Sequence, residues 1–344
     1  MFVEQYSDIL APERGHPMSF DTPILLIVWR RPHNAKQTID AIRMAAPSRM
    51  FVACDGPNLG RPGEAEKVQA TRALIDREID WPCTIERRYS DINQGCRLAV
   101  SSAITWFFEH TEGGIILEDD CVPHPDFFPY CAELLARYRD NPRIWCISGD
   151  NSAGIRLTGD WSYGFIRTPL IWGWATWRRA WKNYDDQMEG WRNIRSTPLL
   201  KCIFPDQLER QTLATIFNRV ADFDEPDSWA YRWSCSSLLN SGLCLMPARN
   251  LISNVGFSED ATNTVGVGPR SFAPAHTIFP LSHPPIVCLD RFADAQVFEK
   301  VHGGTELRRA RRPWNLIRRL LRRSKRLSVG VLSATSFGRI FQTK

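Results

Sequence analysis

The first third of the chain alternates short apolar runs with longer amphipathic segments. The apolar runs have the length of strands, and their β-branched and aliphatic residues are typical of strands buried on both faces. The amphipathic segments have the length and spacing of helices. The pattern predicts strands at residues 24–29, 50–54, 83–88 and 114–117, and helices at residues 33–45, 63–79 and 95–109.

This strict strand–helix order predicts an α/β fold, a mainly parallel sheet with helices on both faces. Ligands of such sheets bind beyond the carboxyl ends of the strands. Polar clusters follow three of the predicted strands, and we expect them to meet at one edge. The clusters are Arg30-Arg31, Asp55-Gly56 and Glu118-Asp119-Asp120.

After Asp126 the pattern becomes mixed. A helix is expected at residues 127–138, a strand at 144–147, and a helical stretch around 199–220, and no internal repeat precedes the tail. We therefore divide the chain into an extension (1–22), one large domain (23–306) and a tail (307–344). Within the domain, we separate residues 23–125, which carry the three polar clusters, from residues 126–306.

The acidic triplet Glu118-Asp119-Asp120 is the strongest chemical signal. Three adjacent carboxylates repel one another, and a divalent cation relieves that repulsion. Mg²⁺ and Mn²⁺ prefer oxygen ligands, and they commonly combine one or two carboxylates with substrate phosphate oxygens. The alternative interpretation, an exposed acidic turn, is weakened by the position of the triplet at a strand end.

Two other strand ends carry weaker signals. Asp55-Gly56-Pro57 forms a turn in many proteins, yet its position would let Asp55 hydrogen-bond a nucleoside. Arg30 and Arg31 could pair with phosphate or stack on a base, or they could simply be a solvated helix start.

Residues 168–181, TPLIWGWATWRRAW, contain four tryptophans. Aromatic rings can form a platform for the apolar faces of a sugar, and they equally often pack in a core. Trp172 and Trp174 are therefore candidates for a sugar-binding site. Gly173 between them indicates a close approach of the backbone, consistent with a binding loop.

Several of these motifs together resemble a known family. LLIVWRRPHN, MFVACDGP, GIILEDDCVPHPDFFPYCAELL and TPLIWGWATWRRAW are similar in order and spacing to nucleotide-diphospho-sugar transferases of GT-A fold. The resemblance is to the N-acetylglucosaminyltransferase I-like family, and bacterial glycosyltransferases look similar in NQGC, GLCLMPARNLISNVGFSEDAT and FPLSHP. It covers residues 23–285.

The resemblance implies a UDP-sugar donor, a Mn²⁺ (or Mg²⁺) ion and inversion at the transferred carbon. It assigns the metal to Asp120 and the nucleotide sugar to Glu118 and Asp119. It also places Arg31 at the donor and Asp55 at the uridine. The pair Gly173-Trp174 would then lie in a loop near the transferred sugar.

The chain departs from the family at the general base, since Ala230 stands where a carboxylate is expected. Inverting transfer needs a group that accepts the proton of the acceptor hydroxyl. Asp227 is the first substitute, and Glu225, Glu259 and Asp260 are further candidates. The family's histidine near the nucleotide is also unmatched. His283 in PLSHPP is a candidate for a late metal ligand, or a structural residue of a proline-rich loop.

The net charge of +5 hides an asymmetry. Residues 307–344 contain twelve Lys or Arg and no acidic residue, which leaves 31 basic against 38 acidic side chains elsewhere. The pattern of WNLIRRLLRRSKRL, with apolar and basic faces, is typical of a helix lying on an anionic membrane. Alternatives are a disordered tail or a nucleic-acid contact, and no nucleic-acid partner is expected for the acidic body.

Ten cysteines occur without a C-x-x-C pair, several within apolar runs, and the N-terminal residues have no secretory pattern. We expect buried free thiols in a cytoplasmic protein attached to the inner face of the membrane. The predicted function is a metal-dependent glycosyltransferase that uses a UDP-sugar (a GlcNAc or related hexose donor) and a glycan or lipid-linked acceptor. Residues 23–125 are then expected to be the nucleotide-binding half of the domain, and residues 126–306 the acceptor half. The alternatives are a nucleotidyltransferase, and a GT-A protein that binds sugar or nucleotide without turnover.

Overall fold

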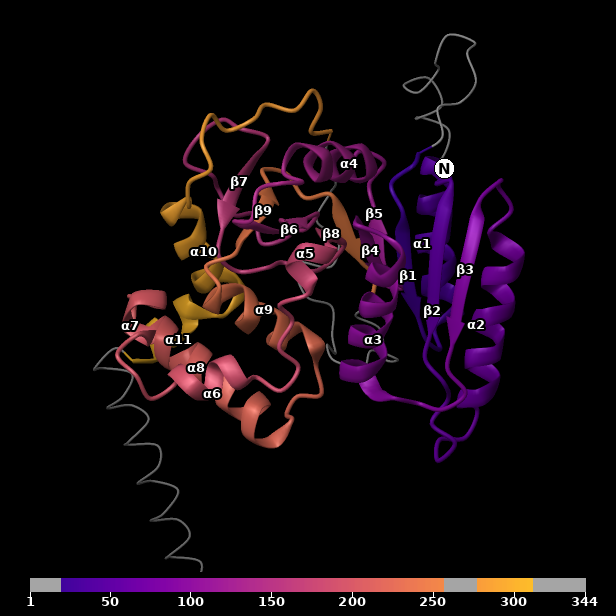
Figure 1. Ribbon diagram of the computed structural model, residues 1–344, viewed down its shortest axis with the longest axis horizontal. Coiled ribbons are helices and arrows are strands. Elements are labelled where there is room, and N and C mark those ends of the chain that lie inside the picture. The colour runs from indigo at the N-terminus through magenta and orange to yellow at the C-terminus, as the bar shows by residue number, and fades with distance from the viewer. Residues whose placement is uncertain (1–19, 257–276, 312–344) are drawn as a thin grey trace, which may run out of the picture.

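A computed structural model describes residues 20–256 and 277–311. An eight-stranded sheet runs through the whole described chain in the order β3-β2-β1-β4-β8-β6-β9-β7 (Figure 1). A two-stranded sheet, β10-β5, lies beside it. The strands are β1 Ile24–Val28, β2 Arg49–Cys54, β3 Thr84–Tyr89, β4 Gly113–Glu118, β5 Cys121–Pro123, β6 Ile144–Ser148, β7 Tyr163–Ile166, β8 Trp174–Trp177, β9 Leu243–Pro247 and β10 Ile252–Asn254.

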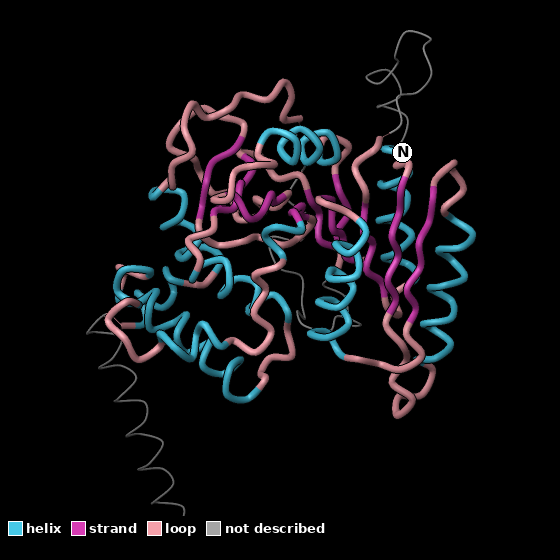
Figure 2. The backbone as a smooth tube through the Cα atoms, in the orientation of Figure 1, coloured by secondary structure: helices cyan, strands magenta, loops and turns pink. Residues whose placement is uncertain are grey.

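Helices surround this sheet, and three long helices connect the parallel strands of the first half (Figure 2). The helices are α1 Pro32–Ala45, α2 Glu64–Glu78, α3 Gly95–His110, α4 Phe127–Arg137, α5 Arg178–Trp181, α6 Glu189–Ile194, α7 Leu200–Ile203, α8 Gln207–Phe223, α9 Trp229–Leu239, α10 Arg291–Val301 and α11 Gly304–Ala310.

The predicted order of the first third is confirmed, with element ends shifted by about one residue. Strands β3, β2, β1 and β4 are all parallel neighbours, as the alternation requires. The helical stretch expected at 199–220 is two helices, α7 and α8. Pro205 lies between them and has no N–H to continue a helix, and Asp206 caps α8 by accepting from the Glu209 amide.

The second half of the sheet is mixed, so the parallel arrangement predicted from the first third applies to the first half of the sheet. Strand β8 runs antiparallel to both β4 and β6, and β7 runs antiparallel to β9. The α/β class therefore holds, with a parallel half and a mixed half in one continuous sheet. The boundary between residues 125 and 126 falls just before α4, inside this continuous structure.

Alternation along β1 separates two cores. Ile24, Leu26 and Val28 pack toward α1, α2 and α4. Leu25 and Ile27 face the opposite side, toward α3, α9 and α10. Because successive strand side chains point to opposite faces, a run of five buried residues requires cover on both faces. A smaller third core lies among α6, α7, α8 and α9.

The tryptophan-rich segment belongs mostly to the core. Residues 174–177 form β8 in the middle of the sheet, and the rings of Trp174 and Trp177 are buried. Trp174 stacks on Trp229 with centroids 5.6 Å apart and an 18° interplanar angle. Trp233 lies 5.8 Å from the same ring. Aromatic packing explains this composition, except at Trp172.

The cysteines are free, as expected from their apolar surroundings, and six of the ten are buried. Among the described residues, no helix has both the length and the apolar character that crossing a membrane requires. The proposed amphipathic tail lies outside the described residues from 312 onward. Helix α11, whose second half belongs to the tail, contacts α8 and α10, and Arg308 pairs with Asp206 and Glu299.

Candidate functional site

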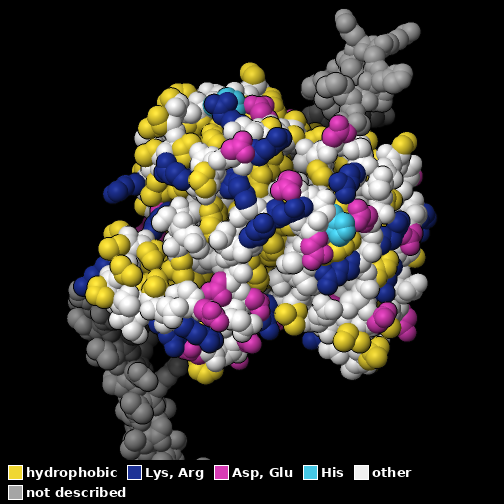
Figure 3. Space-filling model, in the orientation of Figure 1, with side chains coloured by type: hydrophobic (Ala, Val, Ile, Leu, Met, Phe, Trp, Pro, Cys, Tyr) yellow, Lys and Arg dark blue, Asp and Glu magenta, His cyan; other side chains and the backbone are white. Residues whose placement is uncertain are grey.

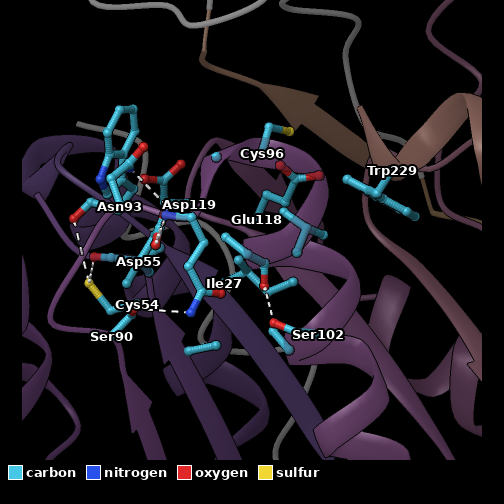
Figure 4. A pocket seen from close by; sticks show the side chains of 18 of the residues that line it. Ile27, Cys54, Asp55, Ser90, Asn93, Cys96, Ser102, Glu118, Asp119 and Trp229 are labelled. Carbon is cyan, nitrogen blue, oxygen red and sulfur yellow. Dashed lines mark hydrogen bonds between the residues drawn. The ribbon is translucent and has the colours of Figure 1, made fainter. Parts of the chain in front are cut away.

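A cavity of about 950 Å³ lies at the carboxyl ends of β1, β2 and β4. The first turns of α3 form one wall, and residues at the start of α9 form another. Figure 4 shows Asp55 and Asn93 on one side, Trp229 on the other, and Glu118 between them. The cavity therefore occupies the strand-end position that the alternating pattern predicts, and it includes all three members of the acidic triplet.

Neighbouring elements hold the triplet in place. Glu118 ends β4 in register with Ile27 of β1. The Asp119 carbonyl accepts a hydrogen bond from Thr38 Oγ1 of α1 at 3.0 Å, and the Val255 amide donates to the Asp120 carbonyl at 2.8 Å. These bonds fix the turn that follows β4 against α1 on one side and the segment after β10 on the other.

Arg31 lies directly across the triplet. Its guanidinium donates to both oxygens of Asp119 and to Asp120 Oδ2, the last at 2.9 Å. Burial by itself lowers the pKa of Arg31, but the charges of Asp119 and Asp120 outweigh burial and hold that pKa above its ordinary value. The sequence predicted Arg31 as a donor contact, and the structure shows its charge shared between two carboxylates.

The carboxylates are strongly perturbed. Burial, with repulsion from Asp120 and Asp119, raises the pKa of Glu118 to about 8. Burial also raises the pKa of Asp119 to about 6, although Arg31 opposes the shift. Acidic groups that are forced together away from water favour their neutral forms. Such perturbed groups in a cavity are a common mark of a functional site.

The triplet leaves limited room for a metal. Within the described residues, no group of three His, Cys, Asp or Glu side chains is arranged to hold an ion. Asp120 accepts from Cys121 Sγ at 3.6 Å and from Arg31, and it packs against Gly256, where a Cβ would lie 2.2 Å from Oδ2. The donor set suits a cation held by one carboxylate, whose other ligands come from a bound phosphate.

Asp55 organises the loop before α3. Its carboxylate accepts from the amides of Gly56 (2.8 Å) and Gln94 (3.0 Å), and from Asn93 Nδ2 (2.8 Å). Burial raises the pKa of Asp55, and the backbone donors oppose that shift. The predicted nucleoside contact therefore needs a qualification: most lone pairs of this carboxylate are used to hold the loop.

The loops after β1, β2 and β3 interlock. Trp29 Nε1 and Asn93 Nδ2 both donate to the Gly56 carbonyl, at 2.9 and 3.1 Å. A Cβ on Gly56 would lie 2.4 Å from the backbone of Ile92, so only glycine fits this approach. These loops form the floor of the cavity beside the triplet.

The three residues proposed from the tryptophan-rich segment separate in the structure. Trp172 is half-buried and lines the cavity. Trp174 is only 1% exposed, which corrects its assignment as a ligand platform, because its ring is covered within the core. Gly173 has the expected close approach, with φ +57°, but its neighbour is Ile252: a Cβ would lie 2.3 Å from Ile252 Cδ1.

The candidate bases are dispersed. Asp227 accepts a hydrogen bond from the Arg97 amide of α3 at 3.3 Å. Its neighbours Pro226 and Ser228 line the cavity, but Asp227 is absent from the described residues of the cavity wall. Glu225 is exposed and pairs with Arg219 at 2.8 Å. Glu259 and Asp260 lie outside the described residues, so their candidacy stays a prediction.

His283 lies away from the triplet. Its Nδ1 is 3.0 Å from the Tyr163 hydroxyl and its Nε2 is 2.9 Å from Glu133 Oε1. With both ring nitrogens engaged by β7 and α4, the metal role considered for His283 has no support in its position. The structural alternative, a residue that attaches a proline-rich loop, agrees with these contacts.

Sequence reasoning missed several cavity residues. Asn93 is one of them, and its side chain joins the loops after β2 and β3. An asparagine two residues before a glycine, at a strand–helix junction, is the signal that would have found it. Trp229 and Tyr231 carried no local signal, since they reach the cavity from a helix more than a hundred residues after the triplet.

The surface charges are mixed on the face that Figure 3 shows. Acidic and basic side chains are interspersed there, without a large area of one sign. Within the cavity itself, the triplet and Arg31 bring opposite charges close together.

The chain matches no family model and no curated protein. Among solved structures, it is similar to the crystal structure of UDP-glucose pyrophosphorylase complexed with UDP-glucose. The identity is 10%, the alignment covers 47% of this chain and 70% of that chain, and the TM-score is 0.26. Agreement this low leaves the function of the present chain to its own residues.

Proposed function

We propose that this protein is a transferase that binds a nucleotide diphospho-sugar, with UDP as the nucleotide, in the cavity at the end of β4. We further propose that it moves the sugar to a glycan or lipid-linked acceptor. One observation carries the proposal: Arg31, Asp119 and Asp120 form a compact charged cluster on the cavity wall. A guanidinium beside carboxylates suits a diphosphate that arrives with a divalent cation.

We do not assign phosphate binding to the first turn of α3, because its amides already have carboxylate partners. Asp55 accepts from the Gln94 amide, and Asp227 accepts from the Arg97 amide. Helix N-termini attract anions, and here two carboxylates already meet that demand. Neutralisation of the diphosphate is therefore assigned to Arg31 and to a cation at Asp120.

Mn²⁺ or Mg²⁺ bound at Asp120 would stabilise charge that develops on the departing phosphate oxygens. The chain's own residues have separate tasks. Arg31 binds and orients phosphate, Asp55 holds the loop that forms the nucleoside end, and Trp172 and Trp229 form apolar walls that exclude water. The twelve basic residues of the tail would attach the enzyme to an anionic membrane surface, on the cytoplasmic side.

Nucleotidyl transfer is the second candidate. Asp227 turns toward α3 rather than into the cavity, which leaves the glycosyl reaction without its first-choice base. Transfer at phosphorus depends mainly on positioning and charge neutralisation. Arg31 and the triplet would serve that reaction as well, with a nucleoside triphosphate and a sugar phosphate as substrates.

A substrate screen separates the two candidates. Glycosyl transfer releases UDP from a UDP-sugar in the presence of Mn²⁺, whereas nucleotidyl transfer releases pyrophosphate from UTP and a sugar 1-phosphate. We expect UDP release, and a loss of about 100-fold or more in Asp120→Asn. Asp76→Asn, which removes an exposed carboxylate on α2, is the matched control. Turnover by Asp120→Asn at the parental rate would overturn the metal assignment.

A further inference from the structure

The N-terminus of α3 is capped from a distant part of the chain. Within the described residues, the side chain of Gln94, the N-cap residue, makes no capping hydrogen bond. Instead Asp227 Oδ1 accepts from the amide of Arg97, the third residue of α3, at 3.3 Å. That amide is the one an N-cap side chain normally satisfies. Asp227 therefore caps the N-terminus of α3, although it lies 130 residues after Arg97 in the sequence.

Gly95 is shaped for this contact. It has φ +80°, and a Cβ at this position would lie 2.6 Å from Asp227 Oδ2. Any larger residue would have to push the carboxylate away from the first turn of α3. Gly95 therefore allows the Asp227 carboxylate, which belongs to the loop between α8 and α9, to lie close to the first turn of α3.

The residues on both sides of Asp227 line the cavity. Pro226, Ser228 and Trp229 belong to its wall, together with Ala230 and Tyr231. A bond from Asp227 to α3 consequently determines how close this wall lies to the nucleotide-binding loops, since Gln94 and Gly95 line the same cavity.

A second set of hydrogen bonds and ion pairs holds the same loop. Arg232, only 2% exposed, donates to the carbonyls of Asp186 (2.8 Å) and Ser228 (2.9 Å) and pairs with Asp224. The Asp186 carboxylate in turn accepts from Arg97 Nη1 at 2.7 Å. Arg97 is therefore connected to the loop directly through its amide, and indirectly through its guanidinium, Asp186 and Arg232.

We propose that Asp227 is a positioning residue that caps α3 and holds the 226–231 wall of the cavity in place, and that it is not the proton acceptor. The catalytic readout of this inference rests on the proposed function. The Asp227 carboxylate faces the first turn of α3 and is absent from the described residues that line the cavity. The proton acceptor is then a different group.

Substitution by asparagine separates the two roles. Asparagine caps helices as well as aspartate does, but it cannot act as a base. We expect Asp227→Asn to keep kcat and the donor KM within about twofold of the parent. Asp227→Ala should raise the donor KM about fivefold, the equivalent of a lost cap, with a smaller change in kcat. Asp222→Asn, an exposed carboxylate paired with Arg195, is the control.

The outcome that overturns the inference is equally clear. If Asp227→Asn lowers kcat as much as Asp227→Ala does, by about 100-fold or more, while donor KM is unchanged, Asp227 is the base. Wild-type-like kinetics in both variants would show that the cap has no part in positioning.

Gly95→Ala tests the contact from its other side. In the parent it should reproduce the donor KM effect of Asp227→Ala, with added backbone strain from the positive φ. In an Asp227→Ala background only the strain should remain, so the two effects should be less than additive. Full additivity would contradict a direct contact between the two residues.

Hydrogen exchange reads the cap without any substrate. The Arg97 amide should exchange faster in Asp227→Ala than in the parent or in Asp227→Asn. If no nucleotide sugar is turned over, the proposed function fails, and the exchange result still decides whether the cap exists. Equal exchange of the Arg97 amide in all three proteins would overturn the inference independently of activity.

Discussion

At the scale of single residues, the site is dominated by carboxylates that are close together and partly removed from water. Glu118 lies beside Asp119 and Asp120 at the end of β4, and Arg31 compensates only part of the negative charge. Burial and like charge therefore act in the same direction on Glu118. The triplet stores a pH-dependent cost that a bound cation or a bound proton would relieve.

This cost gives a pH prediction for the metal-free protein. The pKa of Glu118 rises from an ordinary value of 4.5 in the unfolded chain to about 8 in the folded state. Between these values the folded state binds more protons than the unfolded state, so Glu118 contributes stability at low pH that is lost as pH rises through about 8. Glu118→Gln removes this dependence and should be more stable than the parent at pH values above it.

Urea unfolding in the presence of a chelator, at pH values on both sides of this window, measures the effect. Glu112→Gln is the control, because that side chain is 82% exposed and pairs with Arg178. It should follow the parent at every pH. If Glu118→Gln shows the same pH dependence as the parent, the burial argument for Glu118 is wrong.

At the scale of elements, the cavity depends on loops that follow three adjacent parallel strands. Asp55 after β2 holds Asn93 and Gln94 before α3, and Trp29 after β1 holds Gly56. Helix α2 also holds these loops, since Arg72 donates to the Ser90 carbonyl at 2.5 Å and Glu64 accepts from the Asn58 amide at 2.6 Å. The shape of the loops relies on these bonds and on close backbone packing.

Gly56→Ala tests this packing. Its Cβ would meet the Ile92 backbone at 2.4 Å, and backbone cannot move aside as a side-chain end can. We expect a loss of about 1–3 kcal/mol in the free energy of unfolding, with weaker nucleotide binding. Gly60→Ala in the same loop is the control, since its Cβ meets only the exposed Asn58 side chain, at 3.2 Å.

Chemical unfolding and calorimetric titration with UDP and Mn²⁺ provide the two readouts for these glycine variants. Equal stability and equal UDP affinity for Gly56→Ala and Gly60→Ala would show that the close packing of Gly56 against Ile92 is not required. A loss of stability without a loss of UDP affinity would show that these loops do not take part in UDP binding.

At the scale of the whole molecule, ionic contacts join the sheet to the last helices. Arg167, just after β7, donates to Asp294 of α10 at 2.7 Å and to Glu209 of α8 at 3.0 Å. Burial by itself lowers the pKa of Arg167. The charges of Asp294 and Glu209 outweigh burial and hold this pKa above its ordinary value, so Arg167 stays charged. These contacts connect the mixed half of the sheet to the third core.

Removing this mostly buried cation should lower the free energy of unfolding. Arg167→Met leaves Asp294 and Glu209 without their partner, and we expect a loss of about 3–5 kcal/mol in the free energy of unfolding. Arg195→Met breaks an exposed pair with Asp222 and should cost about 0–1 kcal/mol. Urea unfolding of both variants gives the comparison, and equal losses would contradict the role of burial.

The tail prediction also belongs to the whole molecule. Removing residues 312–344 should leave UDP binding intact and abolish sedimentation with anionic vesicles, because each basic residue near such a surface contributes about 1 kcal/mol. A variant with Arg318, Arg319, Arg322 and Arg323 changed to Gln separates charge from apolar contact. Unchanged vesicle binding by the truncated protein would contradict membrane attachment through the tail.

The sequence by itself determined the elements of the parallel half and the edge at which the site lies. Periodicity identifies strands and helices locally, and parallel strands necessarily bring their carboxyl ends to one edge. The acidic triplet and Arg31 were therefore predictable as neighbours. The mixed half was not, since β8 carries a tryptophan pattern and its antiparallel pairing depends on β4 and β6.

Only the tertiary structure decided what several of these residues contact. Trp174 packs in the core, Asp55 holds a loop, and Asp227 caps α3 from 130 residues away. Their local sequences are compatible with either a ligand or a protein partner, because an aromatic ring or a carboxylate offers the same chemistry to both. The partner is selected by long-range packing, which no local pattern of residues encodes.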